Sequence, residues 1–356
     1  MKLIGKIILV ILVCVLVVEC VMRVALLFTW ESPLYMADKD TGYRMRPHIT
    51  FGNVTVNASG FNDKEHDQKK NKNMVRMAVI GDSFVFGVVE RRHNFTALIQ
   101  EKADRSGKKI EVLNMGIPAA GPRQYLGLIN KDAAKMEADI ACVVFFVGND
   151  TLQSHPDFET RIFAGSTRDV LARPYLMGLS LKYILSYRTL RATTRQLRER
   201  FKPPQENGTF TKESFLEIET ERATVSEKTR SDFMKTCYAS SIELIKKMDL
   251  EAKKRGITFF VVLAPDEFQV NAALQQDIVK QSRMTADHYD FQQPQRQMVR
   301  DLGDAGIAVL DLLPLYLADG GKRSYYIPRD THWNEEGNRL AADTIWSFME
   351  SRRLFK

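Results

Sequence analysis

Five short apolar segments, separated by intervals long enough for helices, constrain the fold of this 356-residue chain more than any other feature. Each has the apolar, partly β-branched composition of a buried strand, and the first three end in glycine beside polar residues. They span residues 74–80, 110–116, 139–147, 257–263 and 307–311. Strands that alternate with helices in this way predict a parallel sheet with right-handed crossover connections.

Helix signals fall between these strands. Asn94 is placed to cap a helix that runs to about Arg105, and Pro122 suits the first turn of a helix that runs to about Met136. Further helices are expected over about residues 233–248, 295–302 and 335–349. A short hairpin is expected around residues 54–56.

Polar residues stand where the first three strands end. Ser83 follows the first strand in the triplet Gly81-Asp82-Ser83, Gly116 ends the second, and Asn149 follows the third. The carboxyl ends of parallel strands lie side by side, and open α/β sheets bind their ligands there. By itself, Gly-Asp-Ser is a strand-to-helix turn with a capping side chain, and a structural role is expected for Asp82.

A serine hydroxyl is a poor nucleophile unless a base takes its proton. Near the other end of the chain, His332 can act as that base, and Asp330, two residues earlier, can orient its imidazole. The backbone N–H groups of Ser83 and Gly116 and the Asn149 amide could bind the oxyanion of an acyl transfer. Taken singly, each of these residues also has a structural interpretation as a turn, a cap or a buried histidine.

The order of these motifs resembles the SGNH (GDSL-type) hydrolase superfamily, and the flanking residues resemble its membrane-anchored bacterial members. The four named positions are Ser83, Gly116, Asn149 and His332, and the upstream Asn57-x-x-Gly60-Phe61-Asn62-Asp63 is also similar. The resemblance covers about residues 40–350. It implies a flavodoxin-like three-layer α/β/α sandwich with a central, mostly parallel, five-stranded sheet. It also implies ester chemistry at Ser83, with no cofactor and no metal.

The N-terminal segment has a different composition. Residues 7–30 are mainly apolar, Lys2 and Lys6 precede them, and acidic residues follow. This pattern predicts an N-terminal transmembrane helix over residues 1–30, with the N-terminus inside and the catalytic domain in the periplasm or outside the cell. A cleaved signal peptide is the alternative, but no small-x-small cleavage site follows the apolar core. Glu19 and Arg23, one helical turn apart, suggest a polytopic membrane acyltransferase as a partner, or they pair with each other.

Composition sets the remaining bounds. A hydrophobic content of 44% and a charged content of 27% are ordinary for a folded protein, and a net charge of +7 without a basic-aromatic block does not indicate nucleic-acid binding. Four cysteines at positions 14, 20, 142 and 237 form no disulfide framework and no metal-ligand spacing. The predicted domains are the anchor over residues 1–30, a linker with a small hairpin over residues 31–73, and a hydrolase-like domain over residues 74–356. An insertion at about 151–227 is either a lid or a surface elaboration.

These features lead to one main expectation of function and two alternatives. The main one is a serine-dependent ester hydrolase that acts outside the cytoplasmic membrane on an O-acetylated glycan or a lipid, through a Ser83 acyl-enzyme. The alternatives are an O-acyltransferase that modifies an exported polysaccharide, and a catalytically silent scaffold that binds glycan. Asp150, Asp266 and Glu267 are expected near the mouth of the site as solvated acids, and His48 and His66 are expected at the surface.

Overall fold

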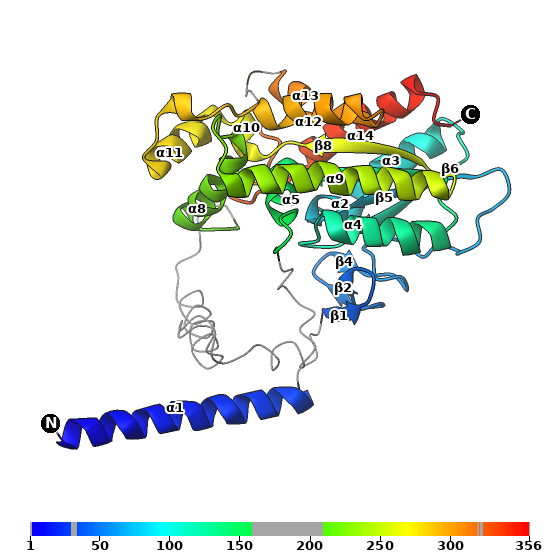
Figure 1. Ribbon diagram of the computed structural model, residues 1–356. Helices are drawn as coiled ribbons and strands as arrows, with labels where there is room; N and C mark the ends of the chain where they lie inside the picture. The colour runs from blue at the N-terminus through cyan, green and yellow to red at the C-terminus, as the bar shows by residue number, and fades with distance from the viewer. Residues whose placement is uncertain (1, 30–33, 159–208, 319, 321–322, 356) are drawn as a thin grey trace. The chain divides into compact units, whose positions relative to one another are not determined.

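The computed structural model describes residues 2–29, 34–158, 209–318, 320 and 323–355 (Figure 1). The chain divides into two compact units. One contains helix α1 (Lys2–Thr29), and the other comprises residues 38–160 and 207–356 and holds the sheet. Strand β1 (Tyr35–Asp38) crosses the boundary between them in sequence.

A five-stranded parallel sheet forms the centre of the second unit. Its strands are β5 (Val75–Gly81), β6 (Ile110–Gly116), β7 (Ile140–Phe146), β8 (Thr258–Ala264) and β9 (Ala308–Asp311). They lie in the order β6-β5-β7-β8-β9, and every pairing is parallel. This is the doubly wound order of flavodoxin-like folds, so the predicted fold class and all five predicted strands are confirmed. The strand order reverses between β5 and β7, where a ligand crevice is expected.

Helices cover both faces of this sheet, as the alternation of elements requires (Figure 1). On one face α3 (Phe95–Arg105) packs against α14 (Glu335–Ser351), and on the other α4 (Pro122–Leu128) and α12 (Gln293–Asp304) pack against α9 (Asp232–Lys254). The remaining helical segments of the unit are α2 (Ser83–Phe86), η1 (Arg91–His93), η2 (Ile129–Ala133), α5 (Val147–Gln153), α8 (Lys212–Ala223), η4 (Thr224–Ser226), α10 (Glu267–Val270), α11 (Ala272–Ser282), η5 (Ala286–His288) and α13 (Leu313–Leu317).

Burial explains why the strands could be predicted. All seven residues of β7 are buried, and so are six of the seven in β5. Strands covered on both faces have nearly continuous apolar sequences, and at about 25 cal/mol per Å² of buried apolar surface such strands supply much of the stability of a core. The predicted cap of α3 is confirmed as well, because Asn94 accepts the N–H of Thr96. Asn334 caps α14 in a similar way and accepts the N–H of Gly337.

Residues 38–66 form the first part of this unit in sequence. They include β2 (Gly42–Met45) and the expected hairpin, formed by β3 (Thr50–Phe51) and β4 (Val54–Thr55). Arg44, which is 8% exposed, forms a bidentate pair with Asp132 at 3.1 and 3.0 Å and a second pair with Asp38 at 2.8 Å. A bidentate pair of this kind fixes the orientation of the guanidinium and also compensates its charge.

The region predicted as an irregular insertion, 151–227, contains more regular structure than expected. Its first residues belong to α5, and residues 212–226 form α8 and η4. The sequence concealed α8 because the inward positions of this helix are Phe215, Glu219 and Ala223, and a buried glutamate breaks the apolar period. Residues 159–208 of this region lie outside the described residues.

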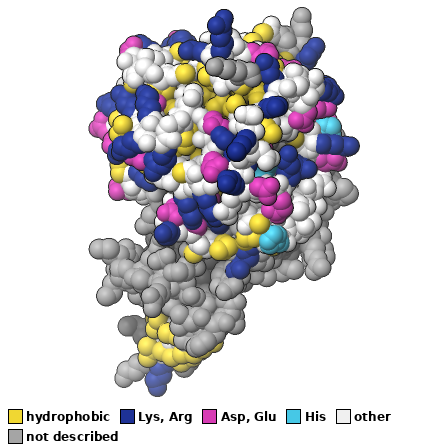
Figure 2. All heavy atoms as spheres, turned by 90° about the vertical axis from the view of Figure 1, so that its right-hand side faces the viewer, with side chains coloured by type: hydrophobic (Ala, Val, Ile, Leu, Met, Phe, Trp, Pro, Cys, Tyr) yellow, Lys and Arg dark blue, Asp and Glu magenta, His cyan; other side chains and the backbone are white. Residues whose placement is uncertain are grey.

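Helix α1 covers most of the segment expected to be a membrane anchor. Within the described part of the chain, no helix reaches the length and apolarity needed to cross a bilayer. Figure 2 shows the face of the molecule at the right of Figure 1, where lysine and arginine side chains are interspersed with acidic ones.

Candidate active site

Ser83 lies two residues beyond β5, at the first position of the one-turn helix α2. Asp82 is the N-cap of this helix and accepts the backbone N–H of Phe84 at 2.9 Å, which is the structural role expected for it. Gly87 ends the helix with a φ of +86°, a left-handed conformation that favours glycine. The turn therefore places the serine at the carboxyl edge of the sheet, after β5, the strand beside which the strand order reverses.

His332 faces Ser83 although the two residues are 249 positions apart in sequence. The His332 Nε2 atom lies 2.7 Å from Ser83 Oγ, and its Nδ1 atom lies 2.5 Å from Asp330 Oδ1. A short loop holds the backbone that carries the imidazole. The N–H of Ile327 donates to the His332 carbonyl at 2.9 Å, and Tyr326 forms an isolated antiparallel β-bridge with Trp333. The structure thus joins the three predicted catalytic residues in one hydrogen-bonded line.

Both oxygens of Asp330 are occupied. Oδ1 contacts the imidazole, and Oδ2 accepts the hydroxyl of Thr209, a residue just ahead of α8. Burial alone would raise the pKa of the Asp330 carboxyl, but the hydrogen bonds from His332 and Thr209 outweigh it and lower that pKa. Asp330 therefore stays ionised and can stabilise a protonated imidazole. No pattern in the sequence pointed to Thr209.

The three predicted oxyanion donors differ in availability. The Ser83 N–H is at the first position of a helix, where no intrahelical acceptor exists. Asn149 lies in the first turn of α5, the helix that directly follows β7. The N–H of Gly116, in contrast, already donates to Asn114 Oδ1 at 3.0 Å. The structure thus leaves the Ser83 N–H without an intrahelical acceptor and engages the Gly116 N–H with Asn114, and Asn149 stays a predicted donor.

Aromatic rings form an apolar wall behind the imidazole. The ring centroid of Phe84 lies 5.3 Å from that of His332, 4.8 Å from that of Trp333 and 4.3 Å from that of Phe146. Trp333 is 2% exposed and packs in the core. These rings restrict the imidazole to one orientation and exclude water from that side of the Ser83–His332 hydrogen bond.

The acids expected to be solvated are instead buried. Asp150 accepts the Tyr125 hydroxyl at 2.9 Å, and both Asp150 and Asp266 are fully buried. Burial raises the pKa of each carboxyl, and burial with the charge of Asp266 does the same for Glu219 of α8. Arg222 lies 3.4 Å from Glu219 and 3.8 Å from Asp266, so one cation is shared between two acids.

Glu267 is partly buried, and burial raises the pKa of its carboxyl to about 7. This is a further departure from the solvated acids expected at the mouth of the site.

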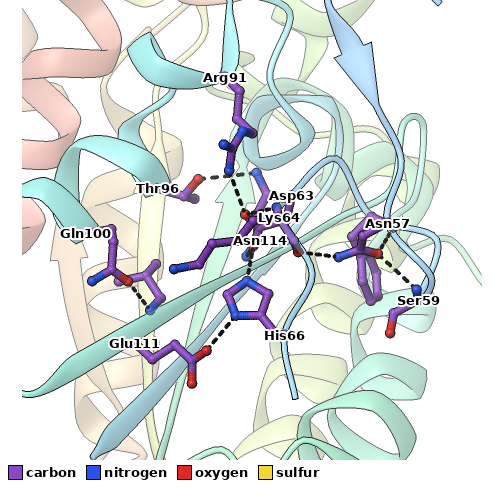
Figure 3. A network of polar contacts seen from close by, with 12 residues as sticks. Asn57, Ser59, Asp63, Lys64, His66, Arg91, Thr96, Gln100, Glu111 and Asn114 are labelled. Atoms are coloured by element: carbon purple, nitrogen blue, oxygen red, sulfur yellow. Dashed lines mark hydrogen bonds and ion pairs between the residues drawn. The ribbon is translucent and has the colours of Figure 1, made fainter. Parts of the chain in front are cut away.

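Another correction concerns histidine. His48 is exposed, as expected, but the side chain of His66 is only 3% exposed and lies between Asp63 and Glu111 (Figure 3). The expectation of a surface position was wrong because Glu111 is 45 residues away and cannot be recognised as a partner in sequence.

A groove of about 590 Å³ opens on another part of this unit, and none of Ser83, His332 and Asp330 lines it. Its lining residues are Asp63, Lys64, Arg91, Arg92, His93, Thr96, Ala97, Leu98, Gln100, Glu101, Val112 and Arg339. Several of its cations are already paired, Arg91 with Asp63 and Arg339 with Glu336, so the groove has no strong excess of one charge.

Residues 224–356 match the family described as the SGNH hydrolase-like domain of the acetyltransferase AlgX. This region contains His332 and Asp330 but begins after Ser83 and Asn149. Among curated proteins, none matches the chain significantly.

Several solved structures match the chain at low identity. A lipase/acylhydrolase from Enterococcus faecalis is 11% identical with a TM-score of 0.42, covering 78% of this chain and 97% of its own. The acetyl xylan esterase AlAXEase is 16% identical with a TM-score of 0.39, covering 77% and 99%. The protein described as TesA is 10% identical with a TM-score of 0.42, covering 79% and 99%.

The family match covers the part of the chain that contains His332. In the folded chain, His332 contacts Ser83, which precedes the matched region. Residues 224–356 are therefore similar to an SGNH hydrolase-like domain, which supports ester chemistry, by an esterase or an acetyltransferase, for this chain.

Proposed function

We propose that this protein is a serine-dependent ester hydrolase that works through an acyl-enzyme on Ser83. The observation that carries the proposal is the continuous line of contacts from Ser83 Oγ through His332 to Asp330, with distances of 2.7 and 2.5 Å. Contacts of this length are within proton-transfer range.

In the first half-reaction, Ser83 Oγ attacks the ester carbonyl while His332 Nε2 takes the hydroxyl proton. The tetrahedral oxyanion would receive hydrogen bonds from the Ser83 N–H and the Asn149 amide. When the carbon–oxygen bond to the leaving alcohol breaks, His332 returns the proton to that oxygen. The acyl group remains on Ser83, and the imidazole is neutral again.

In the second half-reaction, a water or another hydroxyl attacks the acyl-enzyme. His332 takes the proton of the incoming oxygen, and Ser83 Oγ leaves and is reprotonated. Asp330 stays ionised throughout and offsets the charge of the transient imidazolium. Water as the acceptor gives an esterase, and a sugar hydroxyl gives an O-acyltransferase.

The acyltransferase is the second candidate because the matched family is that of an acetyltransferase. We propose an O-acetylated glycan or a lipid as substrate.

We place the catalytic unit outside the cytoplasmic membrane, tethered by residues 1–30, with a polytopic acyltransferase as a partner. The apolar run and flanking charges of the sequence support this placement. A phosphatase fusion at the C-terminus, active only outside the cytoplasm, tests it, and an inactive, well-expressed fusion would refute it.

The test of the serine is covalent labelling with a fluorophosphonate probe. We expect labelling of the wild-type protein and none of Ser83→Ala, with both variants folded by circular dichroism. Equal or absent labelling in the two would refute the serine mechanism and favour the glycan-binding scaffold.

Esterase and transferase are separated by partitioning of the acyl group. The protein is incubated with p-nitrophenyl acetate, with and without a candidate acceptor glycan, and acetate in water and on glycan are both measured. Release to water that the glycan does not change supports the esterase. Acetate appearing on glycan in excess of that released would establish the acyltransferase.

A further inference from the structure

The helix that carries the nucleophile is too short to satisfy its own backbone. Helix α2 has four residues, and a helix leaves its last four carbonyls without intrahelical partners. Three asparagine amides from separate parts of the chain supply donors. Asn114 and Asn94 donate to the Val85 carbonyl at 2.6 and 3.2 Å, and Asn62 donates to the Phe86 carbonyl at 2.9 Å.

Asn62 reaches α2 from a segment whose role the catalytic scheme does not explain. The Asn57–His66 loop contains the Asn-x-x-Gly-Phe-Asn-Asp sequence noted above. Asn57 Oδ1 accepts the N–H groups of Ser59 and Phe61, both at 3.0 Å, and its amide donates to the Lys64 carbonyl at 3.0 Å (Figure 3). Gly60 has a φ of +85°. One asparagine therefore sets the shape of the loop that presents Asn62.

The same loop is fastened to the edge of the sheet. Strand β6 is an edge strand, so one side of it has no neighbouring strand to pair with. Asp63 Oδ2 accepts the backbone N–H of Asn114 at 2.8 Å and contacts His66 Nε2 at 3.0 Å, while His66 Nδ1 lies 2.6 Å from Glu111 (Figure 3). The loop is thus attached to the strand at Asp63 and at His66, both of which follow Asn62 in sequence.

Asn62 is poorly explained as a general stabiliser. It is 3% exposed, and its Oδ1 has no hydrogen-bond partner among the described residues. A buried amide that leaves its oxygen unsatisfied costs stability. An apolar residue of similar size would avoid that cost, so the donor to the Phe86 carbonyl is the feature that needs explanation.

We propose that Asn62 is a positioning residue for Ser83, and that the Asn57–His66 loop fixes the orientation of α2 from the edge of the sheet. The inference rests on the proposed serine mechanism. Because α2 is a single turn, a tilt at its C-terminal carbonyl moves Ser83 at its N-terminus. A displacement of about 1 Å from a productive geometry can cost about 100-fold in rate.

The experiment compares Asn62→Asp and Asn62→Ala with the wild type. The first keeps the shape and removes the donor, and the second removes both. The control is Tyr238→Phe, which loses a 2.8 Å hydrogen bond to Asp301 between α9 and α12, away from α2. Labelling by the fluorophosphonate probe and turnover of p-nitrophenyl acetate are measured well below the lowest melting midpoint of the set.

Both Asn62 variants are expected to lose about 10- to 100-fold in labelling rate and in kcat, with KM little changed. The control should lower the melting midpoint without changing either rate. Wild-type labelling together with unchanged rates in Asn62→Asp would overturn this inference alone. Failure of the wild type to label beyond Ser83→Ala would overturn the proposed function and this inference with it.

Discussion

Gly116 lies against the nucleophile helix so closely that a Cβ atom on it would be 2.1 Å from the backbone nitrogen of Phe86. Its N–H donates to Asn114, whose amide donates in turn to Val85. The glycine thus serves in this structure as the surface on which α2 rests. That role accounts for a glycine at the end of β6 without assigning its N–H to the oxyanion.

Replacement of Gly116 by alanine tests its role as the surface on which α2 rests. The N–H remains in Gly116→Ala, but the methyl group meets backbone atoms that cannot move aside cheaply, so we expect a loss of about 1–3 kcal/mol in unfolding free energy and a drop in kcat. Gly303→Ala is the control, because nothing lies within 4 Å of its added Cβ and alanine favours a helix. Denaturant unfolding and esterase assays measure both effects. Wild-type stability and wild-type kcat in Gly116→Ala would refute the role of Gly116 as the surface that supports α2.

The acid of the triad should be sensitive to each of its two contacts. In Asp330→Asn the imidazole loses the carboxylate that orients it, and we expect a drop in kcat of about 10³- to 10⁴-fold. Thr209→Val removes only the hydroxyl bound to Oδ2 and should cost far less, about tenfold or below. Steady-state kinetics with a chromogenic ester measure both. Near-normal turnover in Asp330→Asn would mean that another group orients His332.

Asn149 is the predicted side-chain donor to the developing oxyanion. Asn149→Ala is expected to lower kcat by about 100- to 1000-fold while leaving KM close to that of the wild type, since the interaction strengthens only in the transition state. Asp82 stays buried behind it, so the melting midpoint should be recorded as well. A rise in KM with unchanged kcat would instead make Asn149 a substrate-binding residue.

His66 should make stability depend on pH. Burial by itself lowers the pKa of the imidazole, but hydrogen bonds and charges from Asp63 and Glu111 outweigh it and raise that pKa above 6.5. Beyond these acids lie Arg91, which is 3.6 Å from Asp63, and Arg76, which is 2.7 Å from Glu111. A raised pKa in the folded state means that the stabilisation is full below the unfolded pKa of about 6.5 and is lost as pH rises through the folded value.

Melting midpoints of the wild type and His66→Gln should therefore differ most at about pH 5.5 and converge toward about pH 9. The exposed His48 provides the matched control, and His48→Gln should show no such pH-dependent difference. A gap between wild type and His66→Gln that stays constant across this range would show that the ring contributes by packing alone.

Sequence reasoning succeeded where one physical signal dominated. The five strands are continuous apolar runs because both faces of the sheet are covered, and Ser83 and His332 stand at strand ends or loops in a distinctive order. It failed where burial depends on distant partners. Arg76, His66 and Glu219 are buried in charged networks whose members come from different elements, and no local pattern predicts such pairing. Gly116 was correctly predicted to end its strand, but its close contact with Phe86 could not be predicted, because it depends on how β6 and α2 pack together.

The hydroxyl of Thr209 on the triad carboxylate makes the hydrogen bonding of Asp330 depend on a residue outside the strand-end motifs. A redesign of the chain just before α8 toward a new ester would therefore also change the contacts of the catalytic acid. A library randomised there should keep threonine or serine at this position, so that changes in selectivity can be measured without a change at Asp330.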